Sequence, residues 1–285
     1  MPRPHSWHIT VFSFLLAMSQ PVCAAPRHVV STFLCTDEYV FRLLPRDRIG
    51  ALSFLAADRH PVVSTIADKV AGIPLVHDSA EEVLSFRPDA VVMYAGTQER
   101  LHVQLRAAGI PIIDAGWSNS LADIRRDALA LGRALGVEDR AKALVAEMDH
   151  TLAAPKPPGA AVRTLIYEPN GYVGTGRVTD EILTRAGLIN VATQIGMTRS
   201  GMIPVEAVIA DPPQLLLLSN ADPRPSLANL VLHHPAFRTL EGHTAIAPVS
   251  LRALACPGPW SVDVLPALLA AGDKARALAQ AQRGP

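Results

Sequence analysis

Two segments of the chain, 125 residues apart, carry the same order of residues: a glutamate, a proline seven positions later, and an apolar run. Glu81 precedes Pro88 and the run 90–93, and Glu206 precedes Pro213 and the run 215–218. Each segment predicts a short helix that is opened by a carboxylate and ended by proline, followed by a buried strand. The repeat therefore predicts two similar α/β lobes, and two-lobed proteins of this kind usually hold a ligand in the cleft between them.

The N-terminus predicts export. Residues 1–24 begin with a modestly basic stretch, continue with an apolar run over 9–18, and end in small residues at Ala24. This order is typical of a secretory signal peptide that is cleaved after Ala24. The apolar run is too short for a permanent membrane span. We therefore expect a mature chain that is exported and soluble.

The charge balance argues against two classes of partner. The chain has 26 Lys and Arg against 26 Asp and Glu, so its formal net charge is zero. Neither nucleic acid nor an anionic membrane surface is expected to attract such a chain. With 49% hydrophobic residues, the mature chain can build two cores.

Strands alternate with helices on both sides of a purely helical region, which predicts parallel sheets. The fold class expected is α/β, with two Rossmann-like lobes joined by a long interlobe helix. Amphipathic spacing predicts the joining helices over 120–135 and 139–152. Their apolar stripe is Leu121, Ile124, Ala128, Leu131 and Leu135. The boundaries expected are 1–24 for the signal peptide, 25–118 for the first lobe, 119–154 for the interlobe helices and 155–285 for the second lobe.

Further elements are expected from local signals. A helix over 36–44 is predicted to begin with a cap at Thr36, Asp37 and Glu38. The residues 73–76 predict an edge strand that contains a proline. Two separate C-terminal helices are expected over 261–271 and 273–282.

Several motifs together resemble the periplasmic binding proteins of ABC importers, in the rigid class that carries ferric siderophores, haem and cobalamin. The paired segments around Glu81 and Glu206 resemble that family's paired glutamate, proline and strand segments. Other motifs that fit, in order and spacing, are the opening strand and helix 28–44, the stretch 174–191 with Thr179, Leu183, Gly187 and Asn190, the run 234–237 and the tail 258–260. The resemblance covers residues 27–280. It implies periplasmic location and capture of a metal chelate between two lobes, without catalysis.

The resemblance also implies roles for individual residues. One glutamate at the tip of each lobe, here Glu81 and Glu206, would dock into an ABC permease dimer. The sparse aromatic residues fall after expected strands on the side of the cleft, which suits a flat ligand such as a corrin or porphyrin. The expected ligand-binding set is Cys35, Thr36, Tyr94, Gly96, Trp117, Tyr172, Gly174, Arg199, Cys256 and Trp260. In particular, Trp117, Tyr172 and Trp260 are expected to line one pocket with Cys35 and Gly174. His77 is the best candidate for an axial ligand.

Cys35 and Cys256 are the two cysteines that remain after cleavage, and three interpretations stay open for them. They can be small buried apolar residues, ligand contacts in the cleft, or the partners of a disulfide that would lock the cleft. Soft-metal ligation by both thiolates supports the rival function, an exported metallochaperone or metal-dependent enzyme on the same scaffold.

The sequence lacks the common motifs of hydrolytic enzymes. The chain contains neither the G-x-S-x-G elbow of hydrolases nor the H-E-x-x-H motif of metalloproteases. Gly171, Gly174 and Gly176 are not followed by the Lys-Ser/Thr pair of a phosphate-binding loop. The function expected is therefore that of a monomeric solute-binding protein without a cofactor, which delivers cobalamin or a ferric siderophore to a permease.

Overall fold

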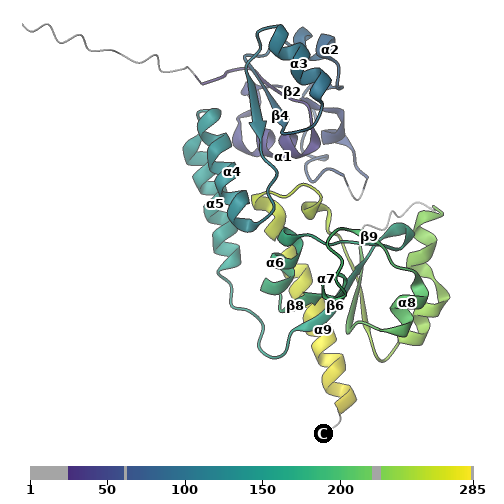
Figure 1. Ribbon diagram of the computed structural model, residues 1–285. Helices are drawn as coiled ribbons and strands as arrows, with labels where there is room; N and C mark the ends of the chain where they lie inside the picture. The colour runs from purple at the N-terminus through teal and green to yellow at the C-terminus, as the bar shows by residue number, and fades with distance from the viewer. Residues whose placement is uncertain (1–24, 61–62, 220–225, 284–285) are drawn as a thin grey trace, which may run out of the picture.

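The computed structural model describes residues 25–60, 63–219 and 226–283, and shows two α/β lobes beside a pair of helices (Figure 1). The expected signal peptide, 1–24, lies outside the described residues. None of the described helices has the length and apolar character that crossing a membrane requires.

The N-terminal lobe is built on a five-stranded parallel sheet with the strand order β3-β2-β1-β4-β5. Its strands are β1 (Val29–Ser31), β2 (Ile49–Ser53), β3 (Leu75–Val76), β4 (Ala90–Tyr94) and β5 (Ile112–Ala115). Its helices are α1 (Leu34–Leu43), α2 (Ala80–Ser85) and α3 (Glu99–Ala107), with short 3-10 turns η1 (Arg46–Arg48) and η2 (Phe54–Ala57). The strand expected over 73–76 is the edge strand β3, so that expectation is confirmed in place but not in length.

The C-terminal lobe carries a four-stranded parallel sheet with the order β11-β10-β6-β8. Its strands are β6 (Val162–Tyr167), β8 (Leu188–Asn190), β10 (Leu215–Ser219) and β11 (Ala245–Val249), and β7 (Tyr172–Val173) pairs antiparallel with β9 (Gly201–Met202). Its helices are α6 (Arg177–Arg185), α7 (Val191–Gln194), α8 (Val205–Ala210) and α9 (Leu265–Arg283). Its 3-10 turns are η3 (Pro169–Gly171), η4 (Ala228–His233), η5 (Pro235–Leu240), η6 (Arg252–Leu254) and η7 (Pro259–Val264).

The sequence repeat corresponds to a structural repeat. The first segment forms α2 and β4, and the second forms α8 and β10. Both strands are internal: β4 lies between β1 and β5, and β10 lies between β11 and β6. Burial on both faces explains why both strands are unbroken apolar runs. The prediction of two parallel α/β lobes is confirmed.

The region between the lobes is a hairpin of two helices, α4 (Leu121–Ala134) and α5 (Glu138–Leu152), which lie side by side at the left of Figure 1. The chain reverses at Gly136, whose φ of 64° is a left-handed conformation that suits glycine. Ser120 begins α4, since its hydroxyl accepts a hydrogen bond from the Asp123 amide at 3.1 Å. The helical prediction for this region is confirmed, and neither helix belongs to a sheet.

One hydrophobic core continues through both lobes and the helical hairpin. Alternate strand residues point to opposite faces of a sheet. In the N-terminal lobe, Val29 and Val92 belong to this shared core, whereas Val30 and Val91 face a core of their own. The C-terminal lobe follows the same rule, with Ile166 in the shared core. The hairpin contributes the apolar stripe predicted from the sequence, and all five of its residues are buried in the shared core.

Helix α1 corrects one expectation. It begins at Leu34 and not at a cap formed by residues 36–38, so Asp37 and Glu38 lie inside the helix and are buried. The Ser53 amide and hydroxyl donate hydrogen bonds to the two Asp37 carboxyl oxygens, at 3.0 and 2.5 Å. Glu38 pairs with Arg42 and accepts a hydrogen bond from the Thr65 amide at 2.8 Å. These acids fix α1 to neighbouring segments instead of capping a helix.

The C-terminal helices correct another expectation. Residues 265–283 form one continuous helix, although Gly272 was expected to separate two. The absence of a side chain at Gly272 instead allows close packing, because a Cβ there would lie 3.1 Å from both Leu188 and Arg276. Glycine here serves contact between helix and strand and does not end the helix.

Asp37 should make stability depend on pH. Burial raises the pKa of Asp37 to about 7, while hydrogen bonds from Ser53 partly oppose this. The unfolded chain ionises Asp37 near its ordinary value, so stability from this group is present at low pH and is lost as pH rises through about 7. We compare the free energy of unfolding of Asp37→Asn with that of the wild type. We predict that this difference shifts in favour of the variant by roughly 1–4 kcal/mol when the pH is raised from about 5 to about 8.

Urea denaturation at the two pH values measures this difference. Asp47→Asn is the control, because Asp47 is exposed on the same lobe. If Asp37→Asn instead becomes less stable relative to the wild type as the pH rises, the fold stabilises the ionised carboxylate. That result would contradict a raised pKa for Asp37.

Candidate ligand-binding site between the lobes

The carboxyl ends of the two parallel sheets face each other. Cys35 follows β1 in the first lobe, Cys256 follows β11 in the second, and a disulfide joins them. Ligands of open parallel sheets bind beyond the carboxyl ends of the strands. This arrangement therefore marks the space between the lobes as the candidate site.

A cavity of about 630 Å³ opens there, within the usual size of small-molecule sites. Residues of both lobes line it, although most come from the C-terminal lobe. The first lobe contributes His60. The second contributes Ile166, Glu168, Pro169, Asn170, Tyr172, Gly174, Thr175, Thr179, Ser200, Met202, Ser226, Ala228, Asn229, Leu251, Leu254 and Ala255.

A tight turn after β6 forms the floor of the cavity. Asn170 has a φ of 61° and Gly171 a φ of 78°, so the chain reverses at once into β7. A side chain at Gly171 would meet the Tyr167 hydroxyl and the Ile203 carbonyl oxygen at about 3 Å, so glycine is required. The Tyr167 hydroxyl donates a hydrogen bond to that carbonyl at 2.9 Å, which holds β9 against the turn. The turn presents Tyr172, which is 43% exposed, to the cavity.

Three aromatic rings gather at the carboxyl end of the N-terminal sheet. Phe33 stacks on Tyr94 at 5.2 Å between ring centroids, and Tyr94 contacts Trp117 at 4.3 Å. Burial raises the pKa of Tyr94 to about 12, so its hydroxyl is neutral. Trp117 donates a hydrogen bond to the Ala95 carbonyl oxygen at 2.7 Å and remains 57% exposed. The indole of Trp117 is therefore held in place although it remains largely exposed.

The structure separates the three aromatic residues that were expected to line one pocket. Tyr172 and Gly174 line the cavity, but Trp117, Cys35 and Trp260 are not among its lining residues. Trp260 is only 3% exposed and packs against α1, where Arg42 lies 4.4 Å above its ring. Its position in the last loop could not reveal this, because the loop folds back onto the first lobe.

The remaining residues of the expected set lie away from the cavity lining. Thr36 is buried and donates a hydrogen bond to the Phe33 carbonyl oxygen at 2.8 Å. Gly96 and Arg199 are exposed in loops. The disulfide decides between the three interpretations of Cys35 and Cys256, since paired cysteines present no thiolate.

The histidines are placed differently from the expectation. His77 stacks on Phe54 and lies 3.3 Å from Glu82, outside the cavity. His60 lines the cavity instead. No local pattern indicates this position, since His60 stands in a loop whose path depends on the whole first lobe.

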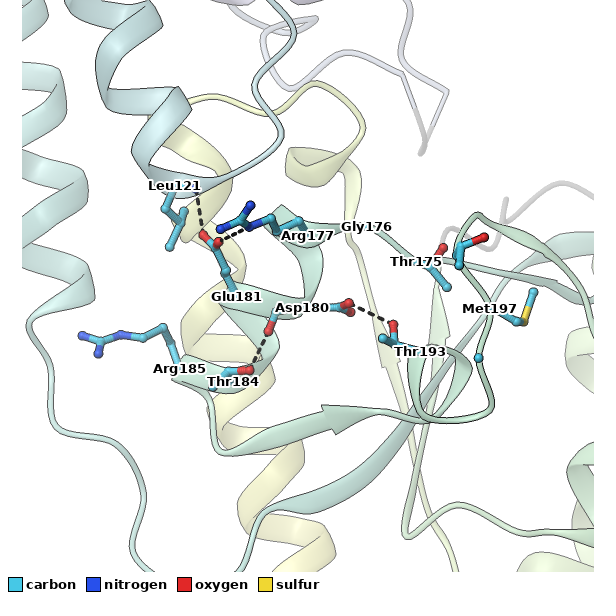
Figure 2. Close-up of a pocket in the computed structure, with 12 residues that line it drawn as sticks. Leu121, Thr175, Gly176, Arg177, Asp180, Glu181, Thr184, Arg185, Thr193 and Met197 are labelled. Atoms are coloured by element: carbon cyan, nitrogen blue, oxygen red, sulfur yellow. Dashed lines mark hydrogen bonds and ion pairs between the residues drawn. The ribbon is translucent and has the colours of Figure 1, made fainter.

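A second hollow of about 740 Å³ lies beside α6, and Thr175 and Gly176 from the loop after β7 contribute to its lining (Figure 2). Its carboxylates are occupied by the protein. Asp180 accepts hydrogen bonds from Thr193 at 2.9 Å and Asn190 at 2.8 Å. Glu181 accepts one from the Leu121 amide at 2.8 Å and another from Arg177 at 3.2 Å. Glu181 thus ties the C-terminal lobe to the start of α4.

Comparison with known proteins agrees with this architecture. A model of the periplasmic binding protein family matches residues 67–241, more than half of the chain. The chain belongs to the periplasmic binding proteins. No curated protein matches it.

Solved structures of similar fold are periplasmic binding proteins as well. A possible iron-binding protein from Staphylococcus epidermidis aligns over 86% of this chain and 98% of its own, with 16% identity and a TM-score of 0.68. A heme-binding protein from Roseiflexus aligns over 87% and 99%, with 21% identity and a TM-score of 0.63. A vitamin B12-binding protein from Vibrio cholerae aligns over 88% and 98%, with 16% identity and a TM-score of 0.62. Identities this low show a shared fold and leave the ligand of this chain open.

The two tryptophans should report their different environments. In the chain without residues 1–24, Trp117→Phe leaves Trp260 as the sole tryptophan, and Trp260→Phe leaves Trp117. Because Trp260 is enclosed and Trp117 is exposed, acrylamide should quench the fluorescence of the second variant strongly and that of the first weakly. Equal quenching of the two variants, with both shown to be folded by circular dichroism, would contradict the burial of Trp260 against α1.

Proposed function

We propose that this protein is the solute-binding component of an ABC importer and captures an uncharged, amide-rich metal chelate of the corrinoid class between its lobes. The observation that carries the proposal is the chemistry of the cavity lining. Among its described residues, no lysine or arginine is present, and Glu168 supplies a carboxylate.

The charge of the lining favours one of the two chelates expected from the sequence. Ferric siderophore complexes often carry net negative charge, and haem carries two carboxylates, so both call for cationic partners such as arginine. Cobalamin is neutral overall and presents amide groups around its ring. The neutral polar side chains of Asn170, Thr175 and Ser200 can exchange hydrogen bonds with such amides.

The apolar part of the lining suits the face of a corrin ring. Tyr172 offers an exposed aromatic ring, and Met202 is 70% exposed at the same cavity. His60 adds an imidazole to the cavity lining. Binding then requires a largely preformed cavity and no chemical step.

Export and docking complete the proposal. The signal peptide expected over 1–24 would place the mature chain in the periplasm, where it would act as a monomer and meet a permease dimer. Glu81 stands in the first turn of α2 and Glu206 in the first turn of α8, at equivalent places of the repeat. Both side chains are exposed, and α2 and α8 both lie at the right of Figure 1, opposite α4 and α5. One free carboxylate on each lobe suits docking to cationic residues of two permease subunits.

The rival function loses its main support. A metallochaperone or metal-dependent enzyme was expected to bind its metal through the thiolates of Cys35 and Cys256. These residues form a disulfide and therefore present no thiolates. Within the described ranges, no group of three or more His, Cys, Asp or Glu side chains has the geometry of a metal site.

The ligand class can be tested by direct titration. We expect tighter binding of cyanocobalamin than of hemin or a ferric tris-catecholate, and little change in its affinity between about 0.05 and 0.5 M salt, because a neutral ligand gains little from charge attraction. Tyr172→Ala should weaken binding of cyanocobalamin by about tenfold, through loss of aromatic contact. Ile189→Ala is the control, since Ile189 is exposed on the same lobe outside the cavity. Tighter binding of either anionic chelate would refute the assignment of a neutral ligand.

The docking role has a separate test. The double variant Glu81→Ala with Glu206→Ala should keep its ligand affinity, because neither side chain lines the cavity, and should lose stimulation of the cognate permease ATPase in proteoliposomes. Asp47→Ala with Glu241→Ala removes one exposed acid from each lobe and should leave stimulation intact. If the first pair stimulates the ATPase as the wild type does, the two glutamates have no part in docking.

A further inference from the structure

One face of helix α1 holds a segment that comes from the other lobe. Cys35, Tyr39 and Arg42 are spaced by four and three residues, which places them on one side of the helix. Cys35 forms the disulfide with Cys256. The Tyr39 ring meets the Trp260 ring edge-on at 4.8 Å, and the Arg42 guanidinium lies 4.4 Å from the centre of the same indole. Three side chains on one face of α1 therefore hold Cys256 and Trp260, the two ends of the segment 256–260.

The residues that precede Cys256 form a wall of the cavity. Leu251, Leu254 and Ala255 all line it. We call residues 251–256 the wall segment. It begins after β11 and ends at the cysteine that α1 holds, so one end follows the C-terminal sheet and the other is bonded to the N-terminal lobe.

Internal hydrogen bonds connect the wall segment to residues 256–260, so the two move together. The Ser261 hydroxyl accepts a hydrogen bond from the Gly258 amide at 3.0 Å and donates one to the Ala253 carbonyl oxygen at 3.1 Å. Side-chain space at Gly258 is taken by the Trp260 ring, since a Cβ there would lie 2.3 Å from it. A displacement of residues 256–260 must therefore be transmitted to the wall of the cavity.

We propose that the Cys35–Cys256 disulfide is a positioning element of the ligand site, which fixes the wall segment at the distance from the first lobe that the ligand requires. The part of this proposal that concerns ligand affinity rests on the proposed function. The bond joins residues 221 positions apart and belongs to a small buried cluster with Tyr94 and Ala115. Without the bond, the Trp260 contacts and the Ser261 hydrogen bonds alone would hold the wall segment. Any further ordering would have to come from the ligand, which reduces affinity.

The competing explanation is that the disulfide stabilises the fold alone. The test compares three full-length proteins processed in the same way: the wild type, Cys35→Ala with Cys256→Ala, and Leu240→Ala. Leu240 is buried in a separate core of the C-terminal lobe, so its truncation lowers stability without touching the wall segment. Binding of cyanocobalamin is measured well below the melting temperature of all three.

We expect the double cysteine variant to bind cyanocobalamin about tenfold more weakly than the wild type and to release it faster. We expect Leu240→Ala to bind as the wild type does. An affinity of the double variant within about twofold of that of Leu240→Ala would overturn the proposal.

Hydrogen exchange without ligand gives an independent readout. Amides of residues 251–256 should exchange faster in the double variant, whereas those of β10, in the middle of the C-terminal sheet, should not change. Unchanged exchange over 251–256 would overturn the positioning role. If the wild type fails to bind cyanocobalamin, the proposed function fails and this exchange experiment still decides the inference.

If the double cysteine variant does not fold, the wild type is used instead, with its disulfide reduced after folding. Reduction should raise exchange over 251–256 and lower affinity for cyanocobalamin, and reoxidation should restore both. If reduction, verified by thiol titration of the denatured protein, changes neither, the disulfide does not position the site.

Discussion

The contact of Trp260 with helix α1 is the interaction on which the arrangement of the two lobes depends. Trp260 is carried by the C-terminal part of the chain, yet its indole is buried between Tyr39 and Arg42 of the first lobe. Arg42 is held in turn by the buried Glu38, so a partly buried charge pair supports the cation–π contact. The adjacent disulfide closes a loop of 221 residues, worth about 5 kcal/mol in the chain-entropy view.

Two further connections act in the same direction. The shared hydrophobic core runs from β1 through α4 and α5 to β6, so moving one lobe against the other would expose apolar surface. Glu181 of the C-terminal lobe also accepts the first backbone amide of α4. Packed cores resist continuous deformation. The cavity between the lobes is therefore largely preformed, as a binding protein with little lobe motion requires.

Much of the fold could be predicted because its signals are local. The repeat around Glu81 and Glu206 predicts its two central strands, since burial on both faces requires unbroken apolar runs. The site was less predictable because it depends on contacts between distant residues. Nothing near Trp260 in the sequence indicates that its loop crosses to α1, and the acids Asp37 and Glu38 have the pattern of a cap until tertiary partners are known. Tyr172 and Gly174 line the cavity because they stand in and directly after the glycine-rich turn that follows β6, a local signal that the sequence shows.

Small-angle X-ray scattering tests the central claim, that these connections hold the lobes in one arrangement, most directly. The radius of gyration of the wild type is measured without ligand and with a chelate at saturation, after binding has been established by titration. The account predicts the same radius of gyration in both states. A clear decrease on binding would mean that the lobes close about a flexible hinge, and would contradict the clamp formed by α1, the disulfide and Trp260.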